Sequence, residues 1–358
     1  MTTIGSQSPP GPPPGAAALP DGWSTDLPGE ADVPGLTELL RRHEERARGW
    51  ASASAEQVRA QLSGPGAAPR EHLVVRDPHG AVRGWASAHD RAAGRLVLDL
   101  TVDRRLDEAA ADSAAATLLG WGDAAAARVG AARGLPSQQV DAGAFADDDR
   151  QHRWLERAGF TQVRTWWQMT RPVTPDEADL DPATRRSVRI RRVRRQGTGL
   201  PDEEDLRTVH DVLEAAFADH FNSHEETFDE FVSRLREDPG HRWDHWWIAE
   251  LVEDGVPTPA GTLVGSVIDG TAGQPDGSYV EYLGVLGSAR GRGVAKSLLR
   301  TVIADAAASG RDRVGLEVDA DSPTGADGLY LSMGWATSYV TESWHKDVPV
   351  PASTEEGP

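Results

Sequence analysis

A glycine-rich turn flanked by cations is the clearest chemical signal in the sequence. Residues 284–296 read GVLGSARGRGVAK and join an apolar strand to a helix. The first N–H groups of a helix lack intrahelical partners and lie at the positive end of the helix dipole, and glycine lets an anion approach the backbone. The turn therefore predicts a phosphate site, and the function depends on the molecule that carries the phosphate.

A carboxylate in the strand before this turn could do acid–base chemistry. Glu281 lies four residues before Val285, and a charged group inside an otherwise apolar strand needs a reason. We predict that Glu281 is the general base. Glu317 and Asp319 on the next strand are the alternative candidates for this role. The alternative is that Glu281 belongs to a solvated strand face.

The elements that must position these residues alternate between strands and helices. Period-two and helical apolar patterns, separated by turns rich in Gly, Pro and Asp, define the elements of the second half of the chain. Its predicted strands are residues 187–193, 245–252, 262–268, 278–286, 314–318 and 338–344. Its predicted helices are residues 203–217, a shorter helix holding Phe228 to Leu235, the helix after the glycine turn, and residues 326–332.

Two interpretations of the glycine turn compete. A dinucleotide fold would also have a strand, a glycine turn and a helix, with Glu317 at a later strand end. However, its third glycine would fall on Lys296, and the turn comes late in its domain, after several apparently antiparallel strands. The pattern Arg290-x-x-Gly293-x-Ala295, followed by LYLSMGW at residues 329–335, instead resembles the GCN5-related N-acetyltransferase (GNAT) family over residues 187–347.

The resemblance implies a set of roles for residues of the second half. In that family the turn binds the pyrophosphate of acetyl-CoA, and the strands on either side of the cofactor splay apart to admit its pantetheine arm. The backbone groups of Leu283 and Val285 would hold that arm, Ser322 stands where the family often has asparagine, and His220 is a candidate acceptor contact. The residues implied for the pyrophosphate are Arg290, Gly291, Arg292, Gly293, Val294, Ala295 and Lys296.

Tyr330 stands where the family places its general acid. A thiol has a reference pKa of about 8.5 and tyrosine about 10, so full transfer from an unperturbed phenol is uphill by roughly 2 kcal/mol. Donation of a hydrogen bond as charge develops on sulfur is the better description of its role. The alternative is a core aromatic that serves packing alone.

The first half of the sequence shows a weaker version of the same order of strand, turn, helix and terminal motif. LDLTV at residues 98–102 corresponds to the strand before the glycine turn, and HRWLERAGF at 152–160 corresponds to the tyrosine segment, with Leu155 in place of Tyr330. Acidic residues, Asp107 among them, replace the glycine turn and would repel a pyrophosphate. We predict a tandem of acetyltransferase-type domains, similar to that of mycothiol synthase, although the pattern does not assign that enzyme.

The predicted fold class is α/β, of the α+β mixed-sheet kind. Two acetyltransferase-type domains each have a mostly antiparallel sheet flanked by helices, and the first is degenerate. The predicted divisions are a disordered tail over 1–30, the degenerate domain over 31–172, a linker over 173–185, the catalytic domain over 186–348, and a disordered tail over 349–358.

Composition narrows the chemistry. The 358 residues include no cysteine, which excludes a thiolate nucleophile and cysteine-ligated metals, and the formal net charge of -19 disfavours nucleic acids and anionic membranes. The arginine-rich run 185–195 fits a strand with a basic exposed face better than a polyanion site, and His241 and His245 lie on a strand without helical metal-ligand spacing. We expect no metal, no nucleic acid and no membrane partner. Without a signal peptide or apolar span, the expected location is the cytoplasm.

The sequence thus predicts an acetyl-CoA-dependent N-acetyltransferase. Its acceptor would be the primary amine of a small molecule or peptide, attacking the thioester directly in a ternary complex. The alternative from another class is a non-catalytic acyl-CoA-binding regulatory or interaction module. The sequence gives neither the acceptor nor the oligomeric state.

Overall fold

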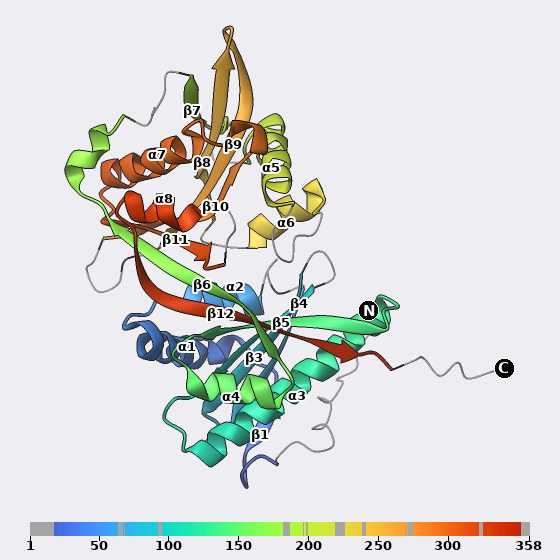
Figure 1. Ribbon diagram of the computed structural model, residues 1–358. Coiled ribbons are helices and arrows are strands. Elements are labelled where there is room, and N and C mark those ends of the chain that lie inside the picture. Colours follow the sequence, from blue (N-terminus) through green and yellow to red (C-terminus); the bar gives the residue numbers. More distant parts are fainter. Residues whose placement is uncertain are drawn as a thin grey trace, which may run out of the picture. The chain divides into compact units, whose positions relative to one another are not determined.

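The computed structural model describes most of the chain. The described residues are 18–63, 67, 69–91, 95–181, 187–195, 197, 200–218, 226–237, 241–268, 270, 275–321 and 325–351. The chain forms two compact units (Figure 1). The first comprises Met1–Thr165 and Thr341–Pro358, and the second comprises Trp166–Val340. Each has a mixed sheet flanked by helices, which confirms the predicted fold class.

The first unit is a sheet that runs in the order β1-β2-β3-β4-β5-β12. All neighbouring strands are antiparallel except β4 and β5, which are parallel. Its strands are β1 (Ser24–Asp26), β2 (Arg70–Arg76), β3 (Val82–Arg91), β4 (Arg95–Val102), β5 (Ser137–Phe145) and the last part of β12 (Ala336–Pro349). Its helices are η1 (Glu30–Asp32), α1 (Val33–Arg48), α2 (Ala55–Leu62), α3 (Glu108–Ala132) and α4 (Asp149–Arg157).

The second unit repeats this plan in the order β6-β11-β10-β9-β8-β7. Only β10 and β11 are parallel. Its strands are β6 (Thr161–Pro172), β7 (Val188–Arg192), β8 (His241–Glu253), β9 (Val256–Ile268), β10 (Gly277–Val285) and β11 (Arg313–Asp319). Its helices are η4 (Pro175–Asp179), α5 (Glu203–Phe217), α6 (Phe228–Glu237), η5 (Gly287–Ala289), α7 (Val294–Ala308) and α8 (Ala326–Ser332).

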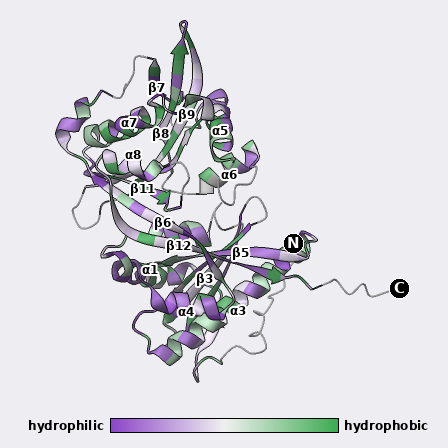
Figure 2. Cartoon of the chain, viewed as in Figure 1, coloured by the Kyte–Doolittle hydropathy of each residue, from purple (hydrophilic) through white to green (hydrophobic). Residues whose placement is uncertain are grey.

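Helices cover both faces of the second sheet (Figure 1). One apolar cluster contains Val294, Leu298 and Val302 of α7 together with Leu316 of β11 and Tyr330 of α8. A second cluster joins α5 and α6 to the opposite face, where Trp246 and Val264 are fully buried. Helices of this sheet carry both apolar and polar residues, as the green and purple parts of α7 in Figure 2 show.

The two units exchange strands. β6 begins in the first unit, and its residues from Trp166 onward pair with β11 of the second. β12 begins in the second unit, and its residues from Thr341 onward pair with β5 of the first. The compact units therefore divide the chain at other positions than the expected boundaries at 172 and 186. The expected linker holds η4, where Glu177 accepts hydrogen bonds from Arg171.

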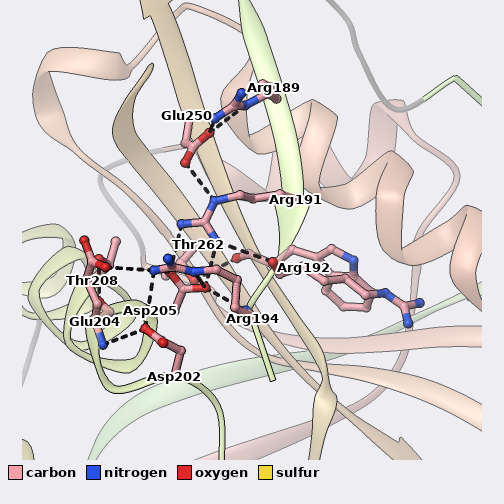
Figure 3. Close-up of polar contacts among 11 residues, drawn as sticks. Arg189, Arg191, Arg192, Arg194, Asp202, Glu204, Asp205, Thr208, Glu250 and Thr262 are labelled. Atoms are coloured by element: carbon pink, nitrogen blue, oxygen red, sulfur yellow. Dashed lines mark hydrogen bonds and ion pairs between the residues drawn. The ribbon is translucent and has the colours of Figure 1, made fainter. Parts of the chain in front are cut away.

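Carboxylates neutralise the arginine-rich strand β7. Arg191 bridges Glu250 of β8 and Asp205 of α5 at 2.8 and 2.7 Å, and Arg194 donates to Asp205 at 2.8 Å (Figure 3). Arg189 donates to the other oxygen of Glu250 at 2.7 Å. The described part of the run contains the predicted strand, and two of its arginines, Arg191 and Arg194, join the edge of the sheet to α5 through Asp205.

Candidate functional site

The glycine turn joins β10 to α7 through η5. Gly291 has φ 72°, and Gly293, the N-cap of α7, has φ 84°. L-amino acids with a side chain are strained in this left-handed region, so the backbone of the turn requires glycine at both positions. The sequence pattern thus encodes a specific loop shape at the start of the helix.

The turn presents donors and positive charge at the helix start. Val294, Ala295 and Lys296 form the first turn of α7, where helical geometry leaves N–H groups without intrahelical partners. Arg290 and Lys296 are exposed, and Arg292 lies 2.6 Å from Glu253 of the β8–β9 hairpin. Backbone donors, a helix dipole and exposed cations together suit a di-anionic group such as a pyrophosphate.

The parallel strands β10 and β11 diverge next to this turn. Their pairing ends at Val280 and Leu316, while β10 continues to Val285 and β11 to Asp319. On its other side β10 stays paired with β9 as far as Val285. Leu283 and Val285 therefore lie where β10 has lost its β11 neighbour, as expected for strands that splay apart. We call the gap between Val280–Val285 and Leu316–Asp319 the strand wedge.

A β-bulge at Glu281, the predicted general base, turns its side chain toward the face of the sheet that α5 covers, here called the α5 face. The bulge lies where the strand wedge begins, next to the last pair of β10 and β11. The register slips between Val280 and Tyr282, so Glu281 is an extra residue opposite β9. Glu281 is exposed, and its Oε1 accepts a hydrogen bond from Ser266 at 2.5 Å. Glu317 occupies the corresponding first position past the pairing on β11. The structure thus brings Glu281 and Glu317, the alternative candidate for the general base, to neighbouring positions on adjacent strands.

Tyr330 lies on the other side of the sheet, within the α7 cluster. Its side chain is buried, its ring meets that of Trp335 edge-on at 6.1 Å, and the cluster also includes Leu283, Val285 and Val318 from the wedge strands. Burial raises the pKa of Tyr330 to about 12. The phenol is therefore protonated at neutral pH and can act only as a donor of a hydrogen bond or a proton.

Comparisons with known proteins agree with this geometry. The model of the acetyltransferase (GNAT) family matches residues 208–335. A mycothiol acetyltransferase of Beutenbergia cavernae is 30% identical over 296 residues, covering 79% of this chain and 86% of that protein. The chain belongs to the GNAT acetyltransferase family. A mycothiol acetyltransferase of Stackebrandtia nassauensis is 27% identical over 320 residues, covering 87% and 95% of the two chains.

Solved structures of GNAT proteins match nearly the whole of this chain, and one of them is described as a tandem GNAT protein. A GCN5-related N-acetyltransferase from Sphaerobacter thermophilus has a TM-score of 0.71 and 25% identity, covering 94% of this chain and 98% of that one. A tandem GNAT protein from the clavulanic acid biosynthesis pathway has a TM-score of 0.64 and 17% identity, covering 92% and 100%. The chain is thus a tandem GNAT acetyltransferase, which confirms the resemblance inferred from the turn and the tyrosine segment.

The first GNAT unit has its own strand wedge, with a carboxylate at the start of the helix that follows β4. Pairing of β4 with β5 ends at Leu98 and Ala142, well before either strand ends. Asp107 caps α3 by accepting a hydrogen bond from the N–H of Ala110 at 2.9 Å, so a carboxylate occupies the anion-binding end of the helix. The predicted acidic replacement of the glycine turn therefore has a structural role as a helix cap.

An ion pair links the ends of the diverging strands in that first unit. Arg104, which follows β4, donates to Asp148, which follows β5, at 3.1 Å through Nη1 and also through Nη2. Arg104 also contacts Nδ1 of His43 on α1 at 3.3 Å. Burial and the neighbouring Arg104 lower the pKa of His43 to about 4, so this imidazole stays neutral beside the guanidinium.

Several predictions about the GNAT site remain open. His220 and Ser322 lie outside the described residues, so the acceptor contact and the contact to pantetheine stay predictions. Of the two histidines weighed as metal ligands, His245 is buried and bonds Asp244 at 3.0 Å through Nδ1. The described segments hold no group of three His, Asp or Glu side chains arranged to bind a metal. Nor does any helix in them have the length and apolarity needed to cross a membrane.

Sequence reasoning missed two polar residues of the GNAT site. Gln168 of β6 donates through Nε2 to Glu317, and the hydroxyl of Tyr279 donates to Oε1 of Gln168 at 3.3 Å. A glutamine within TWWQMTR was visible as a polar residue in an apolar strand. Its partner was not, because a strand's sequence does not identify the strand with which it pairs.

Proposed function

We propose that the second unit binds acetyl-CoA and transfers its acetyl group to a primary amine of a small molecule or peptide. The observation that carries the proposal is the conjunction of the strand wedge with the glycine turn beside it. The turn offers unpaired helix N–H groups and exposed cations for a pyrophosphate, and the wedge offers strand edges for a linear amide-containing arm.

The proposal gives each predicted contact to the acetyl donor a role. Arg290 and Lys296 would contact the pyrophosphate from either side of the turn, while Gly291, Gly293 and the N–H groups of Val294 and Ala295 cradle it. Arg292 would join them by exchanging its contact with Glu253. Leu283 and Val285 would bond the pantetheine amides, as β10 has no strand partner on that side.

The transfer requires direct attack by the amine within a ternary complex. With no cysteine in the chain, the most reactive side-chain nucleophile for an acyl-enzyme is missing. A carboxylate at the base of the wedge, Glu281 or Glu317, would accept the proton of the incoming ammonium. Tyr330 would donate a hydrogen bond to the sulfur as negative charge develops there.

The acceptor is proposed from the relatives and from charge. Two relatives are called mycothiol acetyltransferases, which makes a mycothiol-related amine the first acceptor to test. The net charge of -19 favours the approach of cationic amines over that of anionic molecules. We place the reaction in the cytoplasm.

Measurement of thiol release over a panel of amines tests the proposal. Because the protein contributes no thiol of its own, free coenzyme A can be followed with a thiol reagent without protein background. Mass spectrometry replaces that readout for acceptors that carry a thiol. We expect acetyl-CoA to be consumed only with an amine present and one acetylated amine to form per thiol released.

Two results would contradict this proposal. Acetyl-CoA that binds without thiol release for any amine would favour the non-catalytic acyl-CoA-binding module. Thiol release without an acetylated amine would indicate hydrolysis, in which water replaces the acceptor.

A further inference from the structure

Three polar side chains form a chain of hydrogen bonds on the α5 face of the second sheet. Tyr279 donates to Gln168 at 3.3 Å, and Gln168 donates through its amide nitrogen to Glu317. These residues come from three adjacent strands, β10, β6 and β11. We call Tyr279, Gln168 and Glu317 the amide-bridged cluster.

The register of the sheet builds this cluster. Glu317 lies directly opposite Gln168 in the antiparallel pair of β11 and β6, so their side chains share a face. Tyr279 is paired with Gly315, and a Cβ at Gly315 would lie 3.0 Å from the tyrosine ring. Glycine at position 315 therefore lets the ring of Tyr279 extend across β11 toward Gln168.

The carboxylate of this cluster lies at the base of the strand wedge. Val280 and Leu316 form the last pair of β10 and β11, and Glu317 is the next residue on β11. A thioester whose pantetheine arm lies along the wedge would place its carbonyl beside this position. Glu317 is also solvent-accessible, as an acceptor site requires.

We propose that Glu317 is the base that takes the proton from the acceptor ammonium, and that Gln168 is its positioning residue. The inference rests on the proposed acetyl transfer and departs from the sequence-based choice of Glu281. The side-chain amide of Gln168 fixes Glu317: its nitrogen donates to the Glu317 carboxylate, and its oxygen accepts a hydrogen bond from Tyr279. Glu281 sits on a bulge and is bonded to the hydroxyl of Ser266.

The proton and bond changes balance with these two groups. The acceptor enters as R–NH3⁺ and gives one proton to the Glu317 carboxylate, which frees the nitrogen lone pair. That pair forms the N–C bond to the acetyl carbon, and the electrons of the C–S bond leave with sulfur. The second nitrogen proton reaches the thiolate through solvent while Tyr330 donates a hydrogen bond to the sulfur, and Glu317 returns its proton to water.

The electrostatic surroundings of Glu317 suit a base. Although the side chain keeps some exposure to solvent, partial burial raises the pKa of Glu317, while the hydrogen bond from Gln168 opposes this by favouring the carboxylate. The titratable groups nearest in strand register are Tyr279 and Glu281 on β10 and Asp319 on β11 itself. The β6 residues on that face, Trp166, Gln168 and Thr170, are neutral. A raised pKa makes the carboxylate of Glu317 a stronger base. It also means that activity falls at a higher pH on acidification, because the protonated carboxyl group cannot accept a proton.

The test is the pH dependence of kcat/KM, with acetyl-CoA affinity measured by calorimetry. Glu317→Gln should lower kcat/KM by about 10²–10⁴ and remove the acidic limb of the profile. Gln168→Leu removes the hydrogen bond that favours the carboxylate and positions it, so the acidic limb should move to higher pH by about one to two pH units and turnover on the plateau should fall. Both variants should keep their affinity for acetyl-CoA, which also reports on folding.

Matched controls separate this role from general damage. Gln162→Leu makes the same change at an exposed position of β6, and Asp312→Asn removes a carboxylate just before β11; both should leave the profile unchanged. If Glu317→Gln does not fold, Glu317→Ala with added formate replaces it. Rescue of turnover by formate, and not by chloride, supports a base at this position.

The possible failures can be told apart. A Glu317→Gln enzyme with normal turnover and a normal acidic limb, together with loss of both in Glu281→Gln, would overturn the inference and leave acetyl transfer intact. A Gln168→Leu enzyme with reduced turnover and an unmoved limb would overturn the positioning role. Absence of thiol release by the wild-type protein with every amine would overturn the proposed function and this inference with it.

Discussion

Tyr330 is buried in the α7 cluster, and its burial constrains what it can do. With its pKa raised to about 12, full proton transfer to a thiolate of ordinary pKa is uphill by about 5 kcal/mol. Donation of a hydrogen bond carries no such cost. The structure therefore strengthens the choice, made from reference pKa values, of a hydrogen-bond donor over a free proton carrier.

Removal of that hydroxyl should affect the chemical step alone. We expect Tyr330→Phe to lower turnover by about 10²–10⁴, because the developing thiolate loses its donor. Acetyl-CoA affinity and thermal stability should change little, because the ring still fills its place beside Trp335. Steady-state kinetics and calorimetry measure both. Tyr339→Phe on β12 serves as the matched control, and wild-type turnover in Tyr330→Phe would remove Tyr330 from the mechanism.

At the residue scale, local motifs could be predicted from the sequence and cross-strand partners could not. The glycines at 291 and 293 occupy the left-handed positions that a tight turn into a helix requires. Tyr330 lies on the short helix expected for it. The contact between Gln168 and Glu317 joins residues separated by 149 positions, and only the pairing of β6 with β11 creates it.

At the element scale, α5 is fixed to the sheet through Asp205. This carboxylate is fully buried and accepts hydrogen bonds from Arg191, Arg194 and the backbone N–H of Arg194. These bonds outweigh the effect of burial and lower the pKa of Asp205 below its usual value. Because α5 packs on the same face of β9 and β10, these ion pairs also hold in place the helix that covers that face of the sheet.

Loss of this anchor should destabilise the second unit. We expect Asp205→Asn to lower the free energy of unfolding by about 3 kcal/mol, because it leaves buried donors without their charged partner. Glu204→Gln, at an exposed partner of Arg194, should cost less than about 1 kcal/mol. Because the folded pKa of Asp205 is depressed, its contribution is present above pH 4 and is lost as pH falls below that. The difference in urea midpoint between wild type and Asp205→Asn should therefore shrink below pH 4.

Element boundaries followed from the sequence where caps and periodicity were clear. The predicted helices 203–217 and 326–332 coincide with α5 and α8. The β8–β9 hairpin extends beyond the predicted strands to Glu253 and Val256. Pro257 and Pro259 lie in a connection that the sequence indicated as a turn, but β9 pairs with β10 only from Gly261 onward, so no ladder on that side needs their missing N–H groups.

At the scale of the whole molecule, the exchange of β6 and β12 between the two units could not be predicted from the sequence. Both segments have ordinary strand patterns, and nothing in the pattern of TWWQMTR or TESWHKDVP names the sheet to which it belongs. The expected divisions treated the chain as two consecutive domains. In the structure each unit is completed by a strand from the other half of the chain, so neither sheet is complete in a fragment cut at residue 172 or 186.

The two units differ at the start of the helix that follows the first strand of each wedge. In the second unit, the glycine turn leaves the helix start open and the wedge has no ion pair across it among the described residues. In the first unit, Asp107 caps the helix and Arg104 joins Asp148 across the strand ends. A pyrophosphate there would have to displace a carboxylate cap and face its negative charge. The tandem should therefore hold one donor molecule per chain.

Titration calorimetry with acetyl-CoA measures this number. We expect one binding event per chain, and we expect Gly293→Asp to abolish it, because a carboxylate and a left-handed strain are placed at the start of α7. Gly310→Asp is the matched control, since it introduces similar strain just beyond the C-terminal end of the same helix, where φ is 70° and nothing lies within 4 Å of the added Cβ. Two events in the wild type would show that the first unit also binds the donor. Retained binding in Gly293→Asp would overturn the donor site at the glycine turn, because no other helix start in the described residues combines the open turn with a diverging parallel pair.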